Sequence, residues 1–484
     1  MKRHLSLRIS LLALFSIVLT DLAVVSASQA PNIIFFLSDD HRSDFLGCAG
    51  NGIVQTPRLD QLAAEGVRFN NAFVTTSICA ASRASLFTGL VERSHRYTFG
   101  TPPISKDLTD RSYVQLLRKA GYRTGFVGKF GVGVESEVTK EMFDSFVPLN
   151  RNPYFKKQPD GSTRHVTEIA GDRAIEFIRD RKNEKPFCLS VSFNAAHAED
   201  SDKNDHFPWP KAENGLYENE VIPPPRLSKA EDFESQPDFL KGSLNRLRYF
   251  WRWDTDEKYQ KNVKAYYRMI TGLDRVIGRV LDELKSQGLS ENTIVIFAGD
   301  NGYYKGSRGF AGKWSHYEES LRVPMIIFDP RLETSLRGRI VERMALNIDL
   351  PATMLDYGEV TVPASYQGHS LVELVEGDKT VSWRKDFFCE HLFDRVDIPK
   401  WEGVRGQRWV YARYFQQEPV FEFLHDLSAD PLQRQNLAMD AAFINQLSLQ
   451  RARCDELREL YGGEYSLDKI PTVRYLKSQS EVIR

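Results

Sequence analysis

Short runs of apolar residues alternate along the chain with longer segments whose apolar residues recur at helical spacing. The apolar runs of strand length are Asn32–Leu37, Thr124–Val127, Phe187–Phe193, Thr293–Ala298 and Val323–Phe328. One helix is indicated from Pro57, with Thr56 as its N-cap. Further helices are indicated over Ser112–Ala120, over Ile169–Arg181, and over Lys258–Gln287 with Gly288 as C-cap. Because the runs are almost wholly apolar, we expect strands buried on both faces. The alternation predicts an α/β fold with a mostly parallel sheet covered by helices.

The pattern changes near Val381. Strands separated by turns are indicated at Phe387–Phe388, Arg408–Phe415 and Val420–Leu424, with a helix near Phe443–Tyr461. This predicts a smaller C-terminal α+β subdomain with an antiparallel sheet at 376–484, following a larger domain at 31–375. Within the larger domain, residues 198–257 are charged and proline-rich, and we expect a long loop or insertion there.

The N-terminus has the order of a secretory signal. Three basic residues among the first eight precede an apolar run from Ile9 to Leu19, and small residues follow at Val25–Ala27. The run is short for a bilayer span, and Asp21 interrupts the alternative, an anchor helix. We expect residues 1–27 to be a signal peptide and the chain to be exported, periplasmic or secreted, without a membrane anchor.

Composition narrows the classes of function. The 484 residues include 64 Lys and Arg against 65 Asp and Glu, so the chain lacks the basic footprint of a nucleic-acid-binding protein. The cysteines number five, which makes a disulfide framework unexpected and leaves at least one thiol over. They are Cys48, Cys79, Cys188, Cys389 and Cys454.

Acidic and amide residues follow two of the expected strands. Asp39-Asp40 comes after the first strand and Asp300-Asn301 after Thr293–Ala298. Ligands of open α/β sheets bind beyond the carboxyl ends of the strands, and hard divalent cations prefer oxygen donors. Ordinary turn residues are the alternative for either pair alone.

Cys79 begins a short amphipathic stretch in which Arg83 follows four residues later. A helix starting at Cys79 would present amides that favour anionic groups. A thiolate nucleophile and a buried structural cysteine both remain open on this evidence.

The stretch from Cys79 to Gly89 resembles the signature of type I sulfatases, Cys-x-Pro/Ala-x-Arg followed by Thr-Gly. Other matches follow in the family's order from Pro31 onward: Ser38–Asp44, Gly121–Thr124 with Gly128-Lys129, Ala298–Gly302, Gly312–Trp314, Tyr317-Glu318 with Arg322–Pro324, and Leu424–Leu427 with Asp430-Pro431. The resemblance implies an alkaline-phosphatase-like sandwich with a large mixed, mostly parallel sheet and a C-terminal subdomain. It also implies that a maturation enzyme converts Cys79 to formylglycine, whose hydrated aldehyde attacks sulfur.

The resemblance further implies the roles of individual residues. One Ca²⁺ would be bound by Asp39, Asp40, Asp300 and Asn301 together with modified Cys79. Arg83 would hold the formylglycine diol, and Lys129 and Lys313 would bind the sulfate oxygens. His197 would contact sulfate and could protonate the leaving oxygen.

One position departs from the family. Sulfatases commonly carry a histidine two residues after the first lysine, where this chain has Gly131. That histidine usually contacts the formylglycine, so either another residue substitutes for it, with His95 and His316 as candidates, or turnover is altered.

The resemblance to polysaccharide-degrading bacterial sulfatases implies hydrolysis of O-sulfate esters of a sulfated polysaccharide or oligosaccharide. Trp251 and Trp253 could stack on sugar rings or pack against the core. Substrate contacts are also expected from the C-terminal region, at Glu390-His391 and from Trp401 to Arg408, with Arg405 and Arg408. A phosphate or phosphonate ester hydrolase on the same scaffold, and a non-catalytic glycan-binding relative that keeps the Cys79 thiol, are the alternatives.

Overall fold

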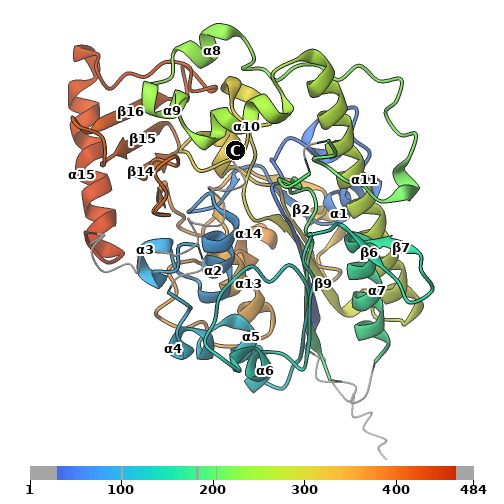
Figure 1. Ribbon diagram of the computed structural model, residues 1–484. Coiled ribbons are helices and arrows are strands. Elements are labelled where there is room, and N and C mark those ends of the chain that lie inside the picture. Colours follow the sequence, from blue (N-terminus) through green and yellow to red (C-terminus); the bar gives the residue numbers. More distant parts are fainter. Residues whose placement is uncertain (1–29, 100–101, 181–184, 203, 465–484) are drawn as a thin grey trace, which may run out of the picture.

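The computed structural model describes residues 30–99, 102–180, 185–202 and 204–464. Its centre is an eight-stranded sheet in the order β11-β2-β10-β9-β1-β8-β4-β5 (Figure 1). The strands are β1 (Asn32–Ser38), β2 (Val67–Phe69), β4 (Arg123–Gly128), β5 (Ser145–Pro148), β8 (Phe187–Ser192), β9 (Thr293–Gly299), β10 (Met325–Phe328) and β11 (Arg339–Val341). The pairs from β9 through β1, β8 and β4 to β5 are parallel, whereas β10 runs antiparallel to β9 and β2. The predicted mixed, mostly parallel sheet is confirmed.

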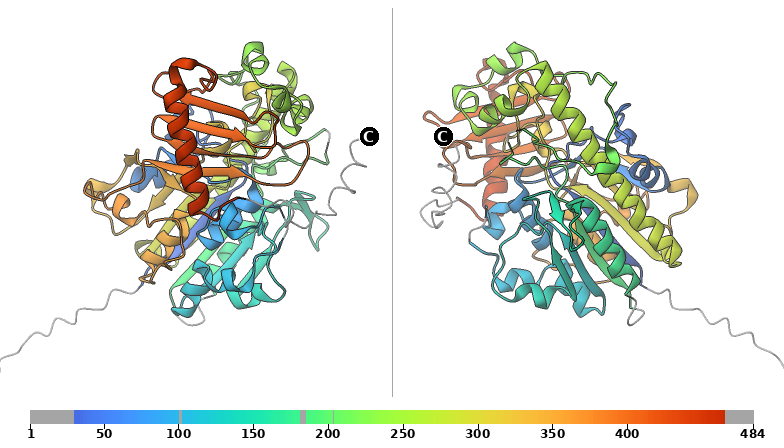
Figure 2. Two further views of the ribbon diagram at one scale, coloured as in Figure 1. Left: turned by 90° about the vertical axis from the view of Figure 1, so that its left-hand side faces the viewer. Right: turned by 45° about the vertical axis from the view of Figure 1, so that its right-hand side comes forward.

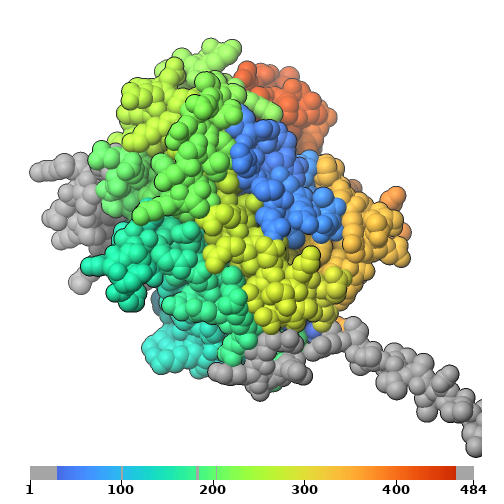
Figure 3. Space-filling model, turned by 90° about the vertical axis from the view of Figure 1, so that its right-hand side faces the viewer, coloured from blue at the N-terminus to red at the C-terminus, as the bar shows by residue number. Residues whose placement is uncertain are grey.

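Helices cover both faces of this sheet because β1 sends successive side chains to opposite sides. Ile33 and Phe35 pack with residues of α2 (Cys79–Thr88), α5 (Tyr113–Lys119) and α13 (Asp349–Tyr357). Ile34 and Phe36 pack with residues of α1 (Pro57–Glu65), α7 (Val166–Arg179) and α11 (Asp256–Ser286). Figure 3 looks onto this second side, where α7 and α11 lie next to each other. The buried apolar runs therefore became central strands with a core on each face.

The C-terminal region forms a second sheet with one long helix (Figure 2). Its antiparallel strands are β13 (Asp386–His391), β14 (Trp401–Gly406), β15 (Trp409–Tyr414) and β16 (Phe421–Asp426). Helix α15 (Ile444–Leu460) packs on it through Leu447, Cys454 and Leu457, which meet Phe388 and Tyr411. The predicted α+β architecture with an antiparallel sheet is confirmed, although β14 was not expected as a strand of its own.

Residues 198–257, where a long loop or insertion was expected, are not loop throughout. They contain α8 (Ala230–Glu234), α9 (Asp238–Lys241) and α10 (Leu244–Arg252), which lie above the edge of the sheet where β1 ends (Figure 1). Trp253 is buried against Phe207 and Tyr259, so it packs into the core, as the alternative for this residue proposed.

The remaining elements are short. They are α3 (Glu92–His95), α4 (Lys106–Asp110), α6 (Val138–Met142), α12 (Glu318–Leu321), α14 (Val372–Val375), the pair β3 (Ala72–Phe73) with β12 (Ala345–Leu346), and the pair β6 (Phe155–Lys157) with β7 (Thr163–His165). The expected signal peptide at 1–27 lies outside the described residues. Among the helices that the structure describes, none has the length and apolar character needed to cross a membrane.

Candidate active site

Two strand ends bring the acidic pairs together. β1 and β9 are parallel and in register from Asn32 with Thr293 to Ser38 with Gly299, so the residues that follow each strand meet at one edge. The backbone N–H of Asp40 donates to Asp300 Oδ1 at 3.2 Å, and Asn301 Nδ2 donates to Asp40 Oδ1 at 2.6 Å. Asp39, Asp40, Asp300 and Asn301 are all buried.

The oxygen atoms of this cluster fit a hard cation. Asp39 Oδ1 and Asn301 Oδ1 are buried and have no hydrogen-bond partner among the described residues. Such atoms are costly to bury unless another group satisfies them. Asp39, Asp40 and His197 each offer a ligand atom, and these atoms lie within 4.8 Å of one another. Carboxylate and amide oxygens are the donors that Ca²⁺ prefers, so this group could bind the ion.

Three cations balance the carboxylates: Arg83 and Lys313 are buried, and Lys129 is partly buried. Lys129 Nζ donates to Asp39 and Lys313 Nζ to Asp40, while Arg83 Nε donates to Asp300 Oδ2 at 2.9 Å. Burial alone would raise the pKa of Asp39, but the charges of Lys129, Arg83 and Lys313 hold it below the usual range. The pKa of Asp300 is raised to about 6 by burial and by the charge of Asp39. The Asp40 charge raises the pKa of Lys313 in spite of burial, so this lysine is a fixed cation.

Cys79 lies at the first turn of α2, directly after the extended residue Ile78. The first amides of a helix lack partners within it and favour negative charge. Cys79 lines a cavity of about 310 Å³ together with Lys129, His197 and Lys313. The structure thus brings the predicted nucleophile and the predicted sulfate-binding residues to one cavity above the acidic cluster.

His197 follows β8 and faces Asp40. Its Nδ1 lies 2.7 Å from the carbonyl oxygen of Ala198, which can only accept, so Nδ1 carries the hydrogen. Its Nε2 lies 3.6 Å from Asp40 Oδ2. Burial, and next the charge of Arg151, hold the pKa of His197 well below its usual value, so the free protein keeps a neutral ring there.

This arrangement can be compared with known proteins. The family model described as Sulfatase matches residues 31–360. The chain belongs to the sulfatase family. A second model, the C-terminal part of N-sulphoglucosamine sulphohydrolase, matches residues 306–459. The chain is therefore a sulfuric ester hydrolase.

Curated relatives of this sulfatase cover most of it. It is 25% identical to an N-acetylglucosamine-6-O-sulfatase of Bacteroides thetaiotaomicron, covering 90% of this chain and 87% of the relative. It is 28% identical to an arylsulfatase of Clostridium perfringens, covering 90% and 95%.

Two solved structures share the fold. One is a complex with D-glucosamine-2-N,6-O-disulfate, with a TM-score of 0.78 at 24% identity, covering 90% of this sulfatase and 98% of that chain. The other is a phosphonate monoester hydrolase of Agrobacterium radiobacter, with a TM-score of 0.73 at 22% identity, covering 92% and 100%.

Neither candidate for the missing histidine lies in the cavity lining of this sulfatase. His95 Nε2 lies 3.1 Å from Ser85 Oγ, and His95 Nδ1 accepts from the backbone N–H of Tyr97 at 3.0 Å. His316 is buried against Tyr414 and His425. Their rings are engaged elsewhere in the core, and the geometry favours neither as a substitute.

The C-terminal residues that the sequence suggested as substrate contacts also make their interactions outside the cavity. Arg405 Nε donates to Glu318 Oε1 at 2.9 Å, Arg408 pairs with Asp426 at 2.6 Å, and Glu390 binds Arg93. None of them lines the cavity, and neither do Trp251, Trp253 or His391. The C-terminal region instead contributes Phe393, Asp394, Arg395 and Ile398, from the segment between β13 and β14.

Several lining residues of this sulfatase were not predicted from the sequence. They are Tyr97, Phe99, Arg151, Asp200, Leu244 and Arg248. Arg248 lies within the charged, proline-rich segment 198–257, but Arg151 carries no local motif. Only the folded chain places them at the active-site edge.

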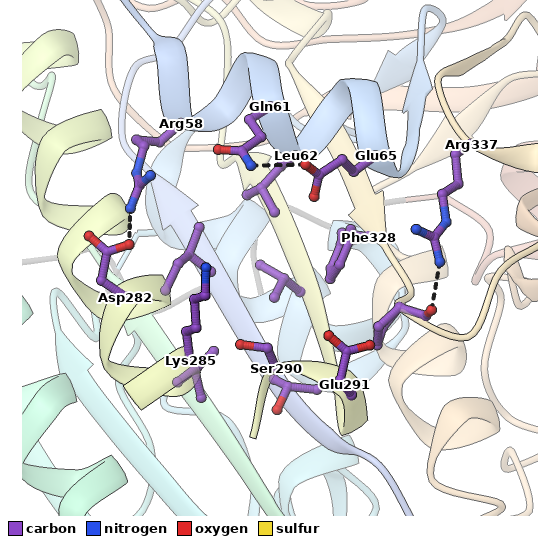
Figure 4. A pocket seen from close by; sticks show the side chains of 15 residues that line it. Arg58, Gln61, Leu62, Glu65, Asp282, Lys285, Ser290, Glu291, Phe328 and Arg337 are labelled. Carbon is purple, nitrogen blue, oxygen red and sulfur yellow. Dashed lines mark hydrogen bonds and ion pairs between the residues drawn. The ribbon is translucent and has the colours of Figure 1, made fainter. Parts of the chain in front are cut away.

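A second cavity, of about 360 Å³, lies at the other end of the sheet (Figure 4). It is lined by residues of α1, α11 and the start of β9. Several of its polar side chains have partners nearby: Arg58 pairs with Asp282, Gln61 Nε2 donates to Glu65, and Arg337 donates to the Pro330 carbonyl oxygen. No residue predicted for catalysis lines this cavity.

Proposed function

We propose that this sulfatase hydrolyses O-sulfate esters of a sulfated carbohydrate, using a formylglycine made from Cys79 and one Ca²⁺. The observation that carries the proposal is the convergence of Cys79 with paired buried carboxylates and lysines at one cavity. A sulfate group is a compact anion, and fixed cations in a water-poor site stabilise the charge that develops on its oxygens.

We assign the metal to Asp39, Asp40, Asp300 and Asn301 with modified Cys79. A bound divalent ion would polarise a sulfate oxygen as a Lewis acid. The formylglycine would supply, as its hydrated aldehyde, the hydroxyl that attacks sulfur.

The other residues act on the substrate or the nucleophile. Arg83 would hold the formylglycine diol, and Lys129 and Lys313 would bind the sulfate oxygens. His197 would contact the sulfate. It would deliver a proton to the leaving oxygen only after Nε2 has taken one up, because in the free protein its ring is neutral with the hydrogen on Nδ1. Support comes from the Lys129 and Lys313 ammonium groups, whose contacts with Asp39 and Asp40 keep them at the cavity floor.

The carbohydrate substrate is supported by the relatives. One is an N-acetylglucosamine-6-O-sulfatase, and another is an ulvan-active sulfatase of Formosa agariphila at 26% identity. We further propose that a formylglycine-generating enzyme matures the chain, that residues 1–27 direct export to the periplasm or outside, and that the catalytic domain spans 31–375 and the C-terminal subdomain 376–484.

Peptide mass spectrometry at Cys79, combined with a desulfation screen, tests this proposal. We expect formylglycine at position 79 and release of sulfate from defined sulfated oligosaccharides, with no release by Cys79→Ala. Faster release of phosphate than sulfate from matched aryl esters would favour the ester-hydrolase alternative. An unmodified thiol without bound Ca²⁺ would instead leave a glycan-binding protein without catalysis.

A further inference from the structure

Arg151 is a cation of the cavity to which the chemistry described above gives no role. Arg151 follows β5, lines the cavity, and its Nε donates to the carbonyl oxygen of Ala198 at 3.2 Å. This is the same oxygen that His197 Nδ1 contacts at 2.7 Å. The shared acceptor fixes the Arg151 guanidinium beside the imidazole of His197.

The terminal nitrogens of Arg151 are available to a ligand. Among the described residues, no hydrogen bond from these nitrogens and no ion pair of Arg151 with a carboxylate within 4.0 Å is found. The nearby carboxylates form no ion pair with Arg151: Asp200 pairs with Arg248 at 2.9 Å and also with Arg252, and Glu199 Oε1 accepts from Ser201 Oγ at 2.5 Å. Of these groups, Arg151, Arg248 and Asp200 line the cavity, so two guanidinium groups accompany one carboxylate there.

Part of the cavity lining is apolar. Phe99 and Phe393 have ring centroids 4.9 Å apart, and Leu244 and Ile398 line the cavity with them. A cavity with an apolar wall and a few directed polar groups is typical of small-molecule sites, where the polar groups fix orientation. A sugar ring held against these apolar residues would have its substituents in the cavity that Arg151 also lines.

We propose that Arg151 binds a second anionic group, a sulfate or a carboxylate, on the sugar that carries the scissile sulfate. The proposal rests on the proposed function, because His197 is the residue assigned to the leaving oxygen. A guanidinium beside that histidine reaches substituents close to the esterified position. Its planar donors match two oxygens of a sulfate or carboxylate, which a single ammonium does not.

The proposal can be tested by comparing kcat/KM for sugars with and without a second anionic group. Three sugars are compared: a monosulfated monosaccharide, the same sugar with a second sulfate on a neighbouring position, and the same sugar with a carboxylate. For the wild-type protein we expect kcat/KM to be about tenfold or more higher with one of the dianionic sugars, as one charge-assisted contact provides. In Arg151→Gln the ratio should fall to within about twofold of one, and Arg151→Lys should keep part of it.

Arg337→Gln is the matched control, because this arginine lies in the remote cavity of Figure 4, where it donates to backbone carbonyls. It should keep the wild-type ratio. A wild-type ratio near one, or an unchanged ratio in Arg151→Gln, would overturn the proposal.

Binding of the same sugars to Cys79→Ala, measured by calorimetry, separates this inference from the proposed function. A dianion preference in binding that Arg151→Gln abolishes supports the Arg151 site even if neither sugar is hydrolysed. Equal binding of all three sugars overturns it whatever the catalytic result.

Discussion

At Gly131, where sulfatases commonly carry a histidine, the backbone itself is unusual. Its φ is +68°, and a Cβ atom there would lie 3.0 Å from Arg83 Cδ and 3.5 Å from Lys129 Cε. Side chains other than glycine are strained at such a φ. Position 131 therefore lacks the imidazole, and its backbone lies close against two residues of the proposed site.

We expect that restoring a histidine will not help catalysis. Gly131→His and Gly131→Ala should each lower kcat/KM by about tenfold or more, since a shift of Arg83 by a few tenths of an ångström misplaces a positioned group. Sulfate release under single-turnover and steady-state conditions would measure this.

Gly121→Ala is the matched control for backbone strain. Gly121 has φ +99°, but nothing lies within 4 Å of a Cβ built there. It should lose stability, by about 1 kcal/mol, and keep its activity. Higher activity in Gly131→His than in the wild-type protein would contradict this expectation, because it would show that the backbone accommodates the histidine side chain.

The proposed catalytic residues were predictable because each stands in a short motif. Asp39-Asp40 and Asp300-Asn301 follow strands that lie side by side in register, so sequence neighbours stay neighbours in space. Arg151 was not predictable, because its place depends on a hydrogen bond to the Ala198 carbonyl across the folded edge. No sequence pattern predicted the contact between His95 and Ser85 either.

At the scale of elements, α1 shows how one helix supports the start of another. Pro57 begins the helix as predicted, but Thr56 makes no side-chain cap bond. Instead Asp274 of α11 accepts from the backbone N–H groups of Leu59 at 2.7 Å and Arg58 at 3.2 Å. A carboxylate from a neighbouring helix thus satisfies the donors that the first turn leaves unpaired.

Asp274→Ala should lower the free energy of unfolding by about 1–3 kcal/mol, because two buried amides lose their acceptor. Urea unfolding would measure the change. Asp282→Ala is the control on the same helix, since it removes only the exposed pair with Arg58 seen in Figure 4 and should cost about 1 kcal/mol or less. Equal losses in the two variants would contradict the capping role.

The contact of α3 with β13 makes stability depend on pH. Glu92 is fully buried, its Oε2 accepts from Thr76 at 2.6 Å, and burial with the charge of Glu390 raises its pKa to about 8. The folded state therefore keeps a proton that the unfolded state releases, and stability falls as pH rises from about 4.5 to 8.

Glu92→Gln should flatten this dependence, because the amide is neutral at every pH. Between pH 5.5 and 8 the wild-type protein should lose on the order of 3 kcal/mol more than the variant, measured by thermal or urea unfolding. Some slope should remain, since the pKa of Glu390 is raised to about 7 by burial. Parallel curves for the two proteins, with Glu65→Gln as an exposed control, would refute this account.

The apolar runs were enough to predict the central strands, because burial on both faces requires such runs. The antiparallel direction of β10 and the three-residue strands β2 and β11 left no comparable pattern. β14 was missed because it is buried through charged pairs: Glu402 meets Arg93 and Arg413, and Arg405 meets Glu318. Ion pairs between distant segments cannot be seen in local hydrophobicity.

The whole molecule is nearly neutral, but positive charge is concentrated in one cavity. The formal net charge is −1, yet Lys129, Arg151, Arg248, Lys313 and Arg395 line one cavity with two carboxylates, Asp200 and Asp394. Attraction of an anionic substrate should therefore come from this cavity rather than from the general surface, and its association rate should fall with ionic strength.

The stability of the whole chain should respond to Ca²⁺. Asp39, Asp40 and Asp300 are buried together, and Asp39 and Asn301 each keep an unpartnered oxygen among the described residues. An ion that binds only the folded state stabilises it by about 2.7 kcal/mol at a concentration of 100 times its Kd. We therefore expect the unfolding temperature to rise by several degrees with excess Ca²⁺ and to fall on chelation.

Two variants test whether the acidic cluster causes this shift in unfolding temperature. Asp300→Asn should weaken the shift because it removes one charge from the cluster, whereas Asp282→Asn, in the remote cavity of Figure 4, should keep it. Identical unfolding temperatures with Ca²⁺ and with chelator, at calcium concentrations up to the millimolar range typical of weak extracellular sites, would mean that the lysines and Arg83 alone neutralise these carboxylates.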